Sequence, residues 1–258
     1  MSPKFSNSGR RLRRVAALAA GLLGAAAGQP ALAVVGGTES SGPLARSTVM
    51  VLNSRGGVCS GVVVAQDVVL TAAHCVAGTA EFRVHWRGED GQPVLIIPAA
   101  RVVHPLFVLN SVAERRRSID LALLRTPTDL PGRFGPIALS SAVPQKGAPV
   151  TLGGYGVARE GDARSTGTFR VADLAVVEPY GRSTILLWAS GARGTGGCEG
   201  DSGGPMADLV GAVAAVTSWA AGEAKRGCGT MSQGVLVAPQ RNWIDRTLAG
   251  WGRAAEWR

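Results

Sequence analysis

Three short segments of the chain carry side chains that could act together: His74 in segment 70–75, Asp120 in segment 118–124 and Ser202 in segment 197–205. A serine hydroxyl is a weak nucleophile at neutral pH and needs a base within hydrogen-bond reach. Histidine, with a pKa near ~6.5, can take that proton and return it. Asp120 stands among apolar residues and suits burial, where a carboxylate would fix the imidazole tautomer and stabilise its cation. This order predicts nucleophilic catalysis with Ser202 as nucleophile, His74 as base and Asp120 as the orienting acid.

The glycines around Ser202 predict how a developing negative charge would be stabilised. Attack on a carbonyl creates an oxyanion, which backbone N–H groups can bind when no side chain blocks the turn. We expect Gly200 and Ser202 to supply these donors. Loss of one such donor costs on the order of 3 kcal/mol of transition-state stabilisation.

Each of these residues taken alone has an ordinary structural interpretation. A serine between glycines is usually a turn, an aspartate is often a cap, and a histidine is often a satisfied polar residue. His104, which precedes Pro105, is expected to be structural, and His85 gives no signal. The catalytic prediction therefore depends on the three residues occurring jointly.

The elements that must position these residues are mainly short strands separated by glycine and proline. Their length and β-branched content favour a barrel or sandwich over βαβ units, so the predicted class is all-β. The clearest predicted strands are residues 48–52, 61–70, 81–86, 94–103, 121–124, 150–152 and 211–218.

One helix is predicted, at the C-terminal end. Pro239 suits a first helical turn, Trp243, Ile244 and Leu248 are spaced to face one side, and Gly250 marks the end. Residues 126–145 have a sparse apolar pattern and are the best linker candidate. They would divide the chain into two similar halves, about 34–130 and 131–258. What the tail 250–258 does stays open.

The first 33 residues differ in kind from the rest. They contain five basic residues and no acidic one, followed by an apolar run of 14 residues, 15–28, and by small residues at 31–33. This order predicts a secretory signal peptide cleaved before Val34, because the run is shorter than the ~20 residues needed to span a bilayer. An uncleaved membrane anchor is the alternative, and Arg10 with Arg11 leaves a twin-arginine export route open. We expect a secreted protein, extracellular or periplasmic, with no stable membrane anchor.

Charge and cysteines exclude several function classes. Residues 34–258 carry 22 basic and 18 acidic residues, a net charge of +4, which does not argue for a nucleic-acid partner. The basic run 115–117 is expected to be a solvated loop. The four cysteines fit an exported protein with two disulfides in any of three pairings, and they form no Cys-x-x-Cys pair. We therefore expect no metal and no cofactor.

Together these motifs resemble the trypsin/chymotrypsin family of serine proteases, and the resemblance runs from Val34 to about Leu248. It rests on Thr-Ala-Ala-His-Cys at 71–75, Asp-Leu-Ala-Leu-Leu at 120–124, Gly-Asp-Ser-Gly-Gly-Pro at 200–205, Val-Val-Gly-Gly at 34–37 and Ser-Trp at 218–219. It implies two six-stranded antiparallel β-barrels with a C-terminal α-helix, with the catalytic groups in the cleft between the barrels. It also implies that Cys59 pairs with Cys75 and Cys198 with Cys228.

The resemblance further implies a switch, in which a new N-terminal amine at Val34 pairs with Asp201. Such a buried pair is tolerable only when both partners are present, so an unprocessed chain would leave the oxyanion hole disordered. No Arg or Lys precedes Val34, so we expect signal cleavage itself to create the active N-terminus. The few disulfides and the richness in Ala, Arg and Gly suggest a bacterial protein.

The family pattern places a substrate pocket around the nucleophile. Its expected residues are Gly196, Gly197, Glu199, Ser218, Trp219, Ala220 and Gly234. A buried carboxylate is needed to pair with an Arg or Lys side chain, and Gly196 at the base supplies none, so we expect a preference for apolar side chains. Glu199 and the charged segment 221–227 could modify that preference.

The function predicted from the sequence is a secreted serine endopeptidase, expected to be a monomer with protein or peptide substrates. A proteinaceous inhibitor is a further candidate partner. The main alternative is a catalytically silent binding protein on the same fold. A second alternative is an esterase, but the nucleophile lacks the Gly-x-Ser-x-Gly elbow and the His, Asp, Ser order differs from that fold.

Overall fold

The computed structural model describes residues 34–78, 80–111, 116–192, 194–223 and 227–258. The chain divides into a segment Met1–Pro30 and a compact unit Ala31–Arg258. The predicted signal peptide 1–33 and the residues Arg115, Lys225 and Arg226 lie outside the described residues. Within the described ranges, no helix is both long enough and apolar enough to cross a membrane.

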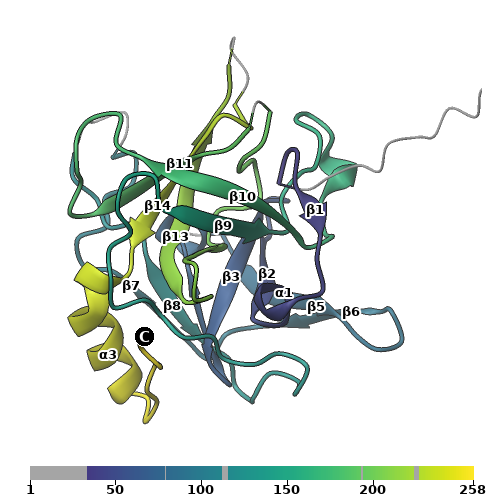
Figure 1. The fold of residues 1–258 in the computed structure, drawn as a ribbon. Coiled ribbons are helices and arrows are strands. Elements are labelled where there is room, and N and C mark those ends of the chain that lie inside the picture. Colours follow the sequence, from purple (N-terminus) through teal and green to yellow (C-terminus); the bar gives the residue numbers. More distant parts are fainter. Residues whose placement is uncertain (1–33, 79, 112–115, 193, 224–226) are drawn as a thin grey trace, which may run out of the picture. The chain divides into compact units, whose positions relative to one another are not determined.

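A seven-stranded antiparallel sheet forms the N-terminal half, in the order β6-β5-β2-β3-β4-β8-β7 (Figure 1). Its strands are β2 (Thr48–Asn53), β3 (Val58–Ala65), β4 (Val68–Thr71), β5 (Phe82–Arg87), β6 (Pro93–Ile96), β7 (Ala100–Val103) and β8 (Ala122–Arg125). The central strands are buried on both faces. Val63 and Val69 lie in one hydrophobic cluster, whereas Val62 and Leu70 lie in another.

The second sheet closes on itself. Its strands are β1 (Thr38–Glu39), β9 (Pro149–Gly154), β10 (Arg170–Val177), β11 (Leu186–Ser190), β12 (Pro205–Ala207), β13 (Val213–Ala221) and β14 (Met231–Leu236). The order is β1-β10-β11-β14-β13-β12-β9, and a further pairing of β9 with β10 completes a six-stranded barrel. The two-residue strand β1, near the start of the described chain, pairs antiparallel with Arg170 and Val171 of β10. The all-β prediction and its antiparallel barrel architecture are confirmed.

Two predicted strands are each two strands in the structure. Segment 61–70 contains parts of β3 and β4, and segment 94–103 contains parts of β6 and β7. The first error arises because both strands are buried on both faces, so their apolar residues form one run across the tight turn at Gln66 and Asp67. In the second case Pro98 lies between the strands, and proline marks a strand end.

The helices are short apart from the last. They are α1 (Pro43–Arg46), α2 (Ala73–Val76), the 3₁₀ turns η1 (Ala163–Ser165) and η2 (Ala238–Gln240), and α3 (Arg241–Ala249). The predicted C-terminal helix is therefore present. Ile244 and Leu248 of α3 are buried against the outer face of the N-terminal sheet, in a cluster with Leu121. Trp243 makes an edge contact with His104 at the end of β7, with ring centroids 4.7 Å apart.

The C-terminal tail returns across both sheets. Trp257 donates a hydrogen bond from Nε1 to Asp245 of α3 at 2.8 Å. The backbone of Leu139 forms isolated β-bridges with Trp257 on one side and with Val213 of β13 on the other. Arg253 donates to the buried carboxylate of Asp67 between β3 and β4. The tail is thus held near its start by Asp67 and near its end by Leu139.

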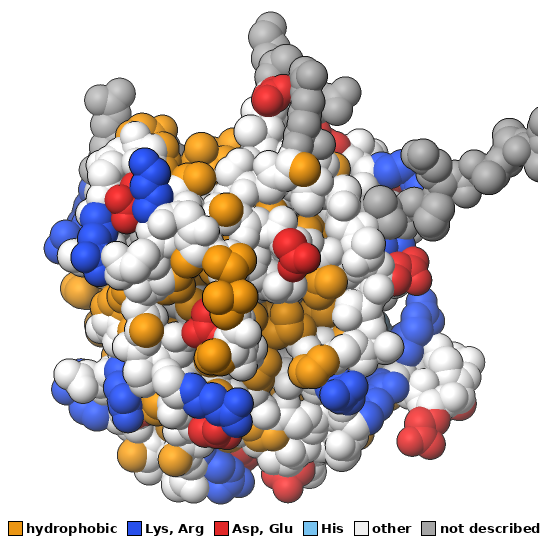
Figure 2. All heavy atoms as spheres, in the orientation of Figure 1, with side chains coloured by type: hydrophobic (Ala, Val, Ile, Leu, Met, Phe, Trp, Pro, Cys, Tyr) orange, Lys and Arg blue, Asp and Glu red, His pale blue; other side chains and the backbone are white. Residues whose placement is uncertain are grey.

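On the face that Figure 2 displays, Asp and Glu side chains lie among the Lys and Arg side chains, with hydrophobic side chains exposed between them.

Candidate active site

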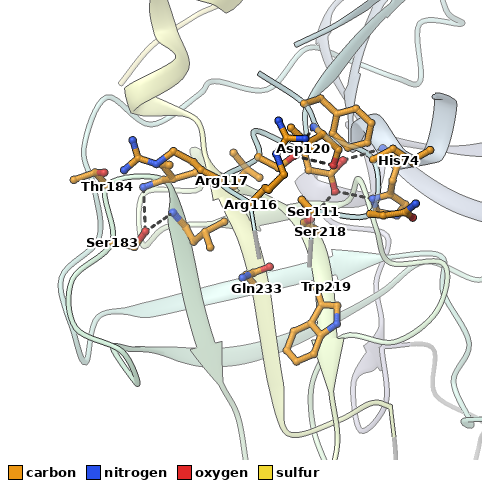
Figure 3. Close-up of a pocket in the computed structure, with 18 of the residues that line it drawn as sticks. His74, Ser111, Arg116, Arg117, Asp120, Ser183, Thr184, Ser218, Trp219 and Gln233 are labelled. Carbon is orange, nitrogen blue, oxygen red and sulfur yellow. Dashed lines mark hydrogen bonds and ion pairs between the residues drawn. The ribbon is translucent and has the colours of Figure 1, made fainter. Parts of the chain in front are cut away.

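His74 and Asp120 are brought together by the pairing of β4 with β8. Thr71 at the end of β4 lies opposite Ala122 at the start of β8, so α2 after the first strand faces the residues before the second. The backbone N–H of His74 donates to Oδ1 of Asp120 at 2.8 Å, and Nδ1 of His74 lies 2.6 Å from Oδ2 (Figure 3). Two contacts, one from the backbone and one from the ring, therefore hold His74 against the carboxylate, and they leave Nε2 free to face another group.

Ser218 also contacts this carboxylate, a contact that could not be predicted from the sequence. The pairing of β13 with β14 shifts register between Thr217 and Trp219, so Ser218 is the extra residue of a β-bulge. A bulge redirects a side chain, and here Oγ of Ser218 donates to Oδ2 of Asp120 at 2.5 Å.

The pKa values of the pair follow from this geometry. Burial by itself would raise the pKa of Asp120, but its bonds from His74 and Ser218 and the imidazolium charge outweigh burial and lower the pKa. Burial by itself would lower the pKa of His74, but the hydrogen bond to Asp120 and the carboxylate charge raise the pKa above its ordinary value. The site therefore favours an imidazolium next to a carboxylate.

Ser202 lies in a turn that is bonded to β3, the neighbour of the strand that leads to His74. Its carbonyl oxygen accepts a hydrogen bond from the Ser60 N–H of β3 at 2.8 Å, and Ser60 in turn accepts from Thr71 of β4 at 2.7 Å. The Ser202 side chain is half-buried and makes no hydrogen bond with His74 among the described residues. Nε2 of His74 instead lies 3.7 Å from Sγ of Cys75. Catalytic hydrogen bonds are often long before a substrate binds.

Two unused donors flank the Ser202 side chain. The N–H of Asp201 donates to the Cys198 carbonyl at 3.1 Å. The N–H groups of Gly200 and Ser202 donate to no other residue in the described part of the chain. Gly200 has a φ of +95°, a backbone conformation that L side chains rarely adopt. The turn thus presents two free N–H groups, one on each side of the bonded N–H of Asp201.

Ser60 contacts the turn of Ser202, and sequence reasoning missed it. Its hydroxyl donates to the Gly200 carbonyl at 2.9 Å and accepts from the Tyr155 N–H at 3.0 Å. It therefore orients the peptide unit of Gly200. A serine within the otherwise apolar run 58–65 was the sequence signal that could have identified it, and in the structure Ser60 is fully buried.

Val34 and Asp201 are both fully buried. Because Val34 is joined to Ala33 in this chain, its nitrogen carries no charge, and Val34 has a φ of +46°, which is unusual for a β-branched residue. The Asp201 carboxylate accepts hydrogen bonds from the N–H groups of Gly156 and Cys198, both at 2.9 Å. Burial outweighs these two bonds and raises the pKa of Asp201 to about 7. No hydrogen bond or ion pair links Val34 with Asp201 among the described residues.

Three of the predicted pocket residues, Gly196, Gly197 and Ala220, lie around Ser232 at the edge of the second barrel. The N–H of Gly197 donates to Oγ of Ser232 on β14 at 2.8 Å, and Ser232 lies opposite Ala220 of β13. A side chain at Gly196 would also meet Ser232. Ser232, which sequence reasoning missed, therefore lies beside Gly196 and Gly197.

Gly234 does not join this cluster. A side chain at Gly234 would meet Sδ of Met206 at 3.0 Å and the Val216 carbonyl at 2.9 Å, so it faces the barrel core. The reason is the register of β14, in which Ser232 pairs with Ala220 whereas Gly234 pairs with Thr217. Glu199 is exposed.

Two disulfides hold the loops of the site. Cys59 is bonded to Cys75 beside His74, and Cys198 is bonded to Cys228 beside the Ser202 turn. This is the pairing that the family resemblance implies. The sulfurs near His74 belong to a disulfide and offer no thiolate, the form of cysteine that binds metals.

Comparisons with known proteins bear on this site. A family model described as Trypsin matches residues 34–244. Chymotrypsin-like elastase family member 1 of Macaca fascicularis is 29% identical over 244 residues, covering 84% of this chain and 90% of that protein. Kallikrein-8 of Rattus norvegicus is 27% identical over 205 residues, covering 74% of this chain and 77% of that protein.

A solved structure shows the same fold. The structure titled neuropsin, a serine protease expressed in the limbic system of mouse brain, superposes with a TM-score of 0.68 at 24% identity, covering 83% of this chain and 99% of that chain. The relatives named here come from mammals and lend no support to the bacterial origin suggested by composition. Because the family model spans most of the sequence and includes every segment of the site, this chain belongs to the trypsin family of serine proteases.

Proposed function

We propose that this chain is a secreted serine endopeptidase in which Ser202 attacks the substrate carbonyl, His74 takes and returns the proton, and Asp120 orients His74. The observation that carries the proposal is the double contact of His74 with Asp120, at 2.8 and 2.6 Å. It assigns the Nδ1 proton to the carboxylate side and leaves Nε2 to act as the base.

The reaction would proceed in two halves. Ser202 Oγ forms a bond to the carbonyl carbon as His74 accepts its proton, and the oxyanion is bound by the N–H groups of Gly200 and Ser202. His74 then protonates the leaving amine, which departs and leaves an acyl-enzyme. In the second half His74 takes a proton from water, which attacks the acyl-enzyme carbonyl. His74 then returns the proton to Ser202 Oγ as the carboxylic acid product leaves. The raised pKa of His74 suits a base that becomes a cation in each half.

Activation would depend on cleavage before Val34. A free amine there would supply the cation that buried Asp201 lacks, and the positive φ of Val34 would no longer be imposed by a preceding residue. The basic, apolar and small residues of segment 1–33 favour signal peptidase as the enzyme that makes this cut. Residues 1–33 would then be a signal peptide and residues 34–258 the proteolytic unit.

Substrate preference would be apolar at the residue preceding the scissile bond. Gly196, Gly197, Ala220 and Ser232 surround the expected pocket and contribute no charge, so a substrate cation would find no carboxylate there to offset its desolvation. That residue and those before it would lie along Ser218, Trp219 and Ala220 of β13.

The proposal is tested with a fluorophosphonate probe and fluorogenic peptides applied to the secreted protein. We expect labelling and peptide cleavage in the natural chain, loss of both in Ser202→Ala, and no loss in the exposed control Ser54→Ala. Equal labelling of Ser202→Ala would contradict the assignment of the nucleophile. A folded chain that neither labels nor cleaves would indicate the silent binding protein instead.

A further inference from the structure

A cavity of about 690 Å³ opens next to the His74 and Asp120 pair (Figure 3). Three parts of the chain form its walls: residues 107–111 and 116–120 between β7 and β8, the residues before β11, and the facing strands β13 and β14. Ser218 and Trp219 of β13 line it. The cavity therefore lies along the strand proposed above to hold the substrate.

Three cationic side chains line this cavity: Arg116, Arg117 and Arg182. Among the described residues that line the cavity, Asp120 is the single carboxylate, and it already accepts hydrogen bonds from His74 and Ser218. The charge left to act on a ligand is therefore positive.

Two of these arginines are available to a ligand. Arg117 and Arg182 are exposed, and neither forms an ion pair within the described residues. Glu178 and Arg182 both border a smaller neighbouring hollow, but no ion pair joins them. Arg117 and Arg182 come from different walls, so a ligand between them could meet both charges.

The rest of the wall combines apolar side chains with uncharged polar ones such as Asn110, Thr184 and Gln233. Phe107, Leu109, Ile185 and Trp219 line the cavity. Oγ of Ser183 accepts hydrogen bonds from the N–H groups of Ile185 and Leu186, at 3.1 and 2.9 Å. This turn fixes the backbone next to Arg182. Such a surface suits a ligand with apolar parts and a negative charge.

We propose that this cavity selects substrates with an acidic side chain, Glu or Asp, within the few residues preceding the scissile bond, through Arg117 and Arg182. The inference rests on the proposed function and deepens it, because it adds a second, charge-dependent requirement to the uncharged pocket around Gly196. The first pocket would read apolar shape and the second would read charge.

The size of the effect follows from exposure. An ion pair between exposed groups changes an equilibrium by at most about fivefold, and salt weakens it. With two arginines, we expect a Glu peptide to be preferred over its Gln counterpart by roughly five- to twentyfold at low ionic strength. At 1 M salt the preference should fall close to one, because screening acts within ~3 Å.

The test uses two peptide series with the same apolar residue before the scissile bond. Glu or Gln is placed at each of the three positions further upstream, and kcat/KM is measured for the natural enzyme and for the double variant Arg117→Gln/Arg182→Gln. We expect the Glu preference at one or more positions and its loss in the double variant. Arg164→Gln, at an exposed arginine outside the cavity, should keep the preference.

Binding to Ser202→Ala provides a readout that does not depend on catalysis. Fluorescently labelled Glu and Gln peptides should differ in Kd by a similar factor, and the difference should vanish when both arginines are replaced. Equal kcat/KM for Glu and Gln peptides in a cleaving enzyme, or a preference that survives the double variant, overturns the inference and leaves the proposed function standing. Absence of both labelling and cleavage overturns the proposed function, and with it the substrate role of the cavity.

Discussion

His74 reaches Asp120 twice, through its backbone N–H and through Nδ1 of its ring, so one carboxylate fixes both the position of the histidine and its tautomer. In the proposed mechanism the second contact is the one that matters for rate. An amide in place of the carboxylate can still accept from the backbone but can present N–H to Nδ1, which would favour the wrong tautomer.

Asp120→Asn should therefore lower kcat by roughly 10⁴-fold while leaving the fold intact. Steady-state kinetics on a fluorogenic peptide measures the loss, and circular dichroism checks the fold. Asp173→Asn, at an exposed carboxylate on β10, is the matched control and should keep full activity. A loss of less than tenfold in the Asp120 variant would count against the assigned role.

The pH dependence of cleavage follows from the raised pKa of His74. The imidazole must be neutral to accept a proton, so activity should rise with pH through a midpoint above 6.5, the ordinary histidine value. NMR titration of the imidazole protons in Ser202→Ala gives an independent measure. His74 should titrate above 6.5 and His104, whose pKa is lowered by burial, below it. The reverse order would refute the interpretation of both environments.

Gly203 provides a test of the turn that carries Ser202. It has a φ of +85°, and a side chain there would overlap the Ser60 carbonyl and Oγ1 of Thr71. Gly211 has a φ of +79° and nothing within 4 Å of the added atom. Both alanine variants carry the backbone strain, of order 1–3 kcal/mol, but only Gly203→Ala adds the overlap. Urea unfolding should show a clearly larger loss for Gly203→Ala, and equal losses would refute the crowding.

How much of this could be foreseen depends on how local each feature is. His74, Asp120 and Ser202 lie in short motifs whose residues specify their own turns, so the sequence pointed to them directly. Ser218 meets Asp120 only because of a bulge in β13, and Ser232 meets Gly197 only through the register of β14. Neither a bulge nor a strand register can be predicted from the local sequence, because both depend on strands that are distant in sequence. β3 and β4 were merged for a different reason, because their apolar residues form one run across the turn at Gln66 and Asp67.

Asp67 and Arg253 are a contact of this non-local kind, 186 residues apart. Asp67 is buried and accepts from Arg253 at 2.8 and 3.0 Å and from Arg125 at 3.0 Å. Burial by itself would raise the pKa of Asp67, but both arginines outweigh it and lower the pKa. This contribution to stability is present above the unfolded pKa near ~3.9 and is lost as pH falls through the folded value.

Arg253→Met should destabilise the fold measurably in urea unfolding at pH 7, because it leaves a buried carboxylate with one partner fewer. Arg258→Met, which removes an exposed pair with Glu256, should have little effect. If the two variants lose the same stability, the tail is not held by Asp67. In Asp67→Asn the part of the stability that the natural chain loses at acid pH should already be absent at pH 7.

The last prediction concerns Asp201 before and after cleavage at Val34. With Val34 still joined to Ala33, the folded pKa of Asp201 is raised from 3.8 to about 7. A raised acid pKa means that stability is fully present below 3.8 and falls as pH rises toward 7, because the unfolded chain ionises first. The uncleaved chain should therefore lose stability between pH 4 and 7, whereas a chain beginning at Val34 should lose less, because its amine compensates the charge. Unfolding curves of both chains across this range measure the difference.

Asp201→Asn in the uncleaved chain should remove the slope of stability against pH, since an amide oxygen can still accept from Gly156 or Cys198 without becoming charged. A slope that persists in Asp201→Asn would assign it to another group and would remove the physical basis for activation by a new N-terminus.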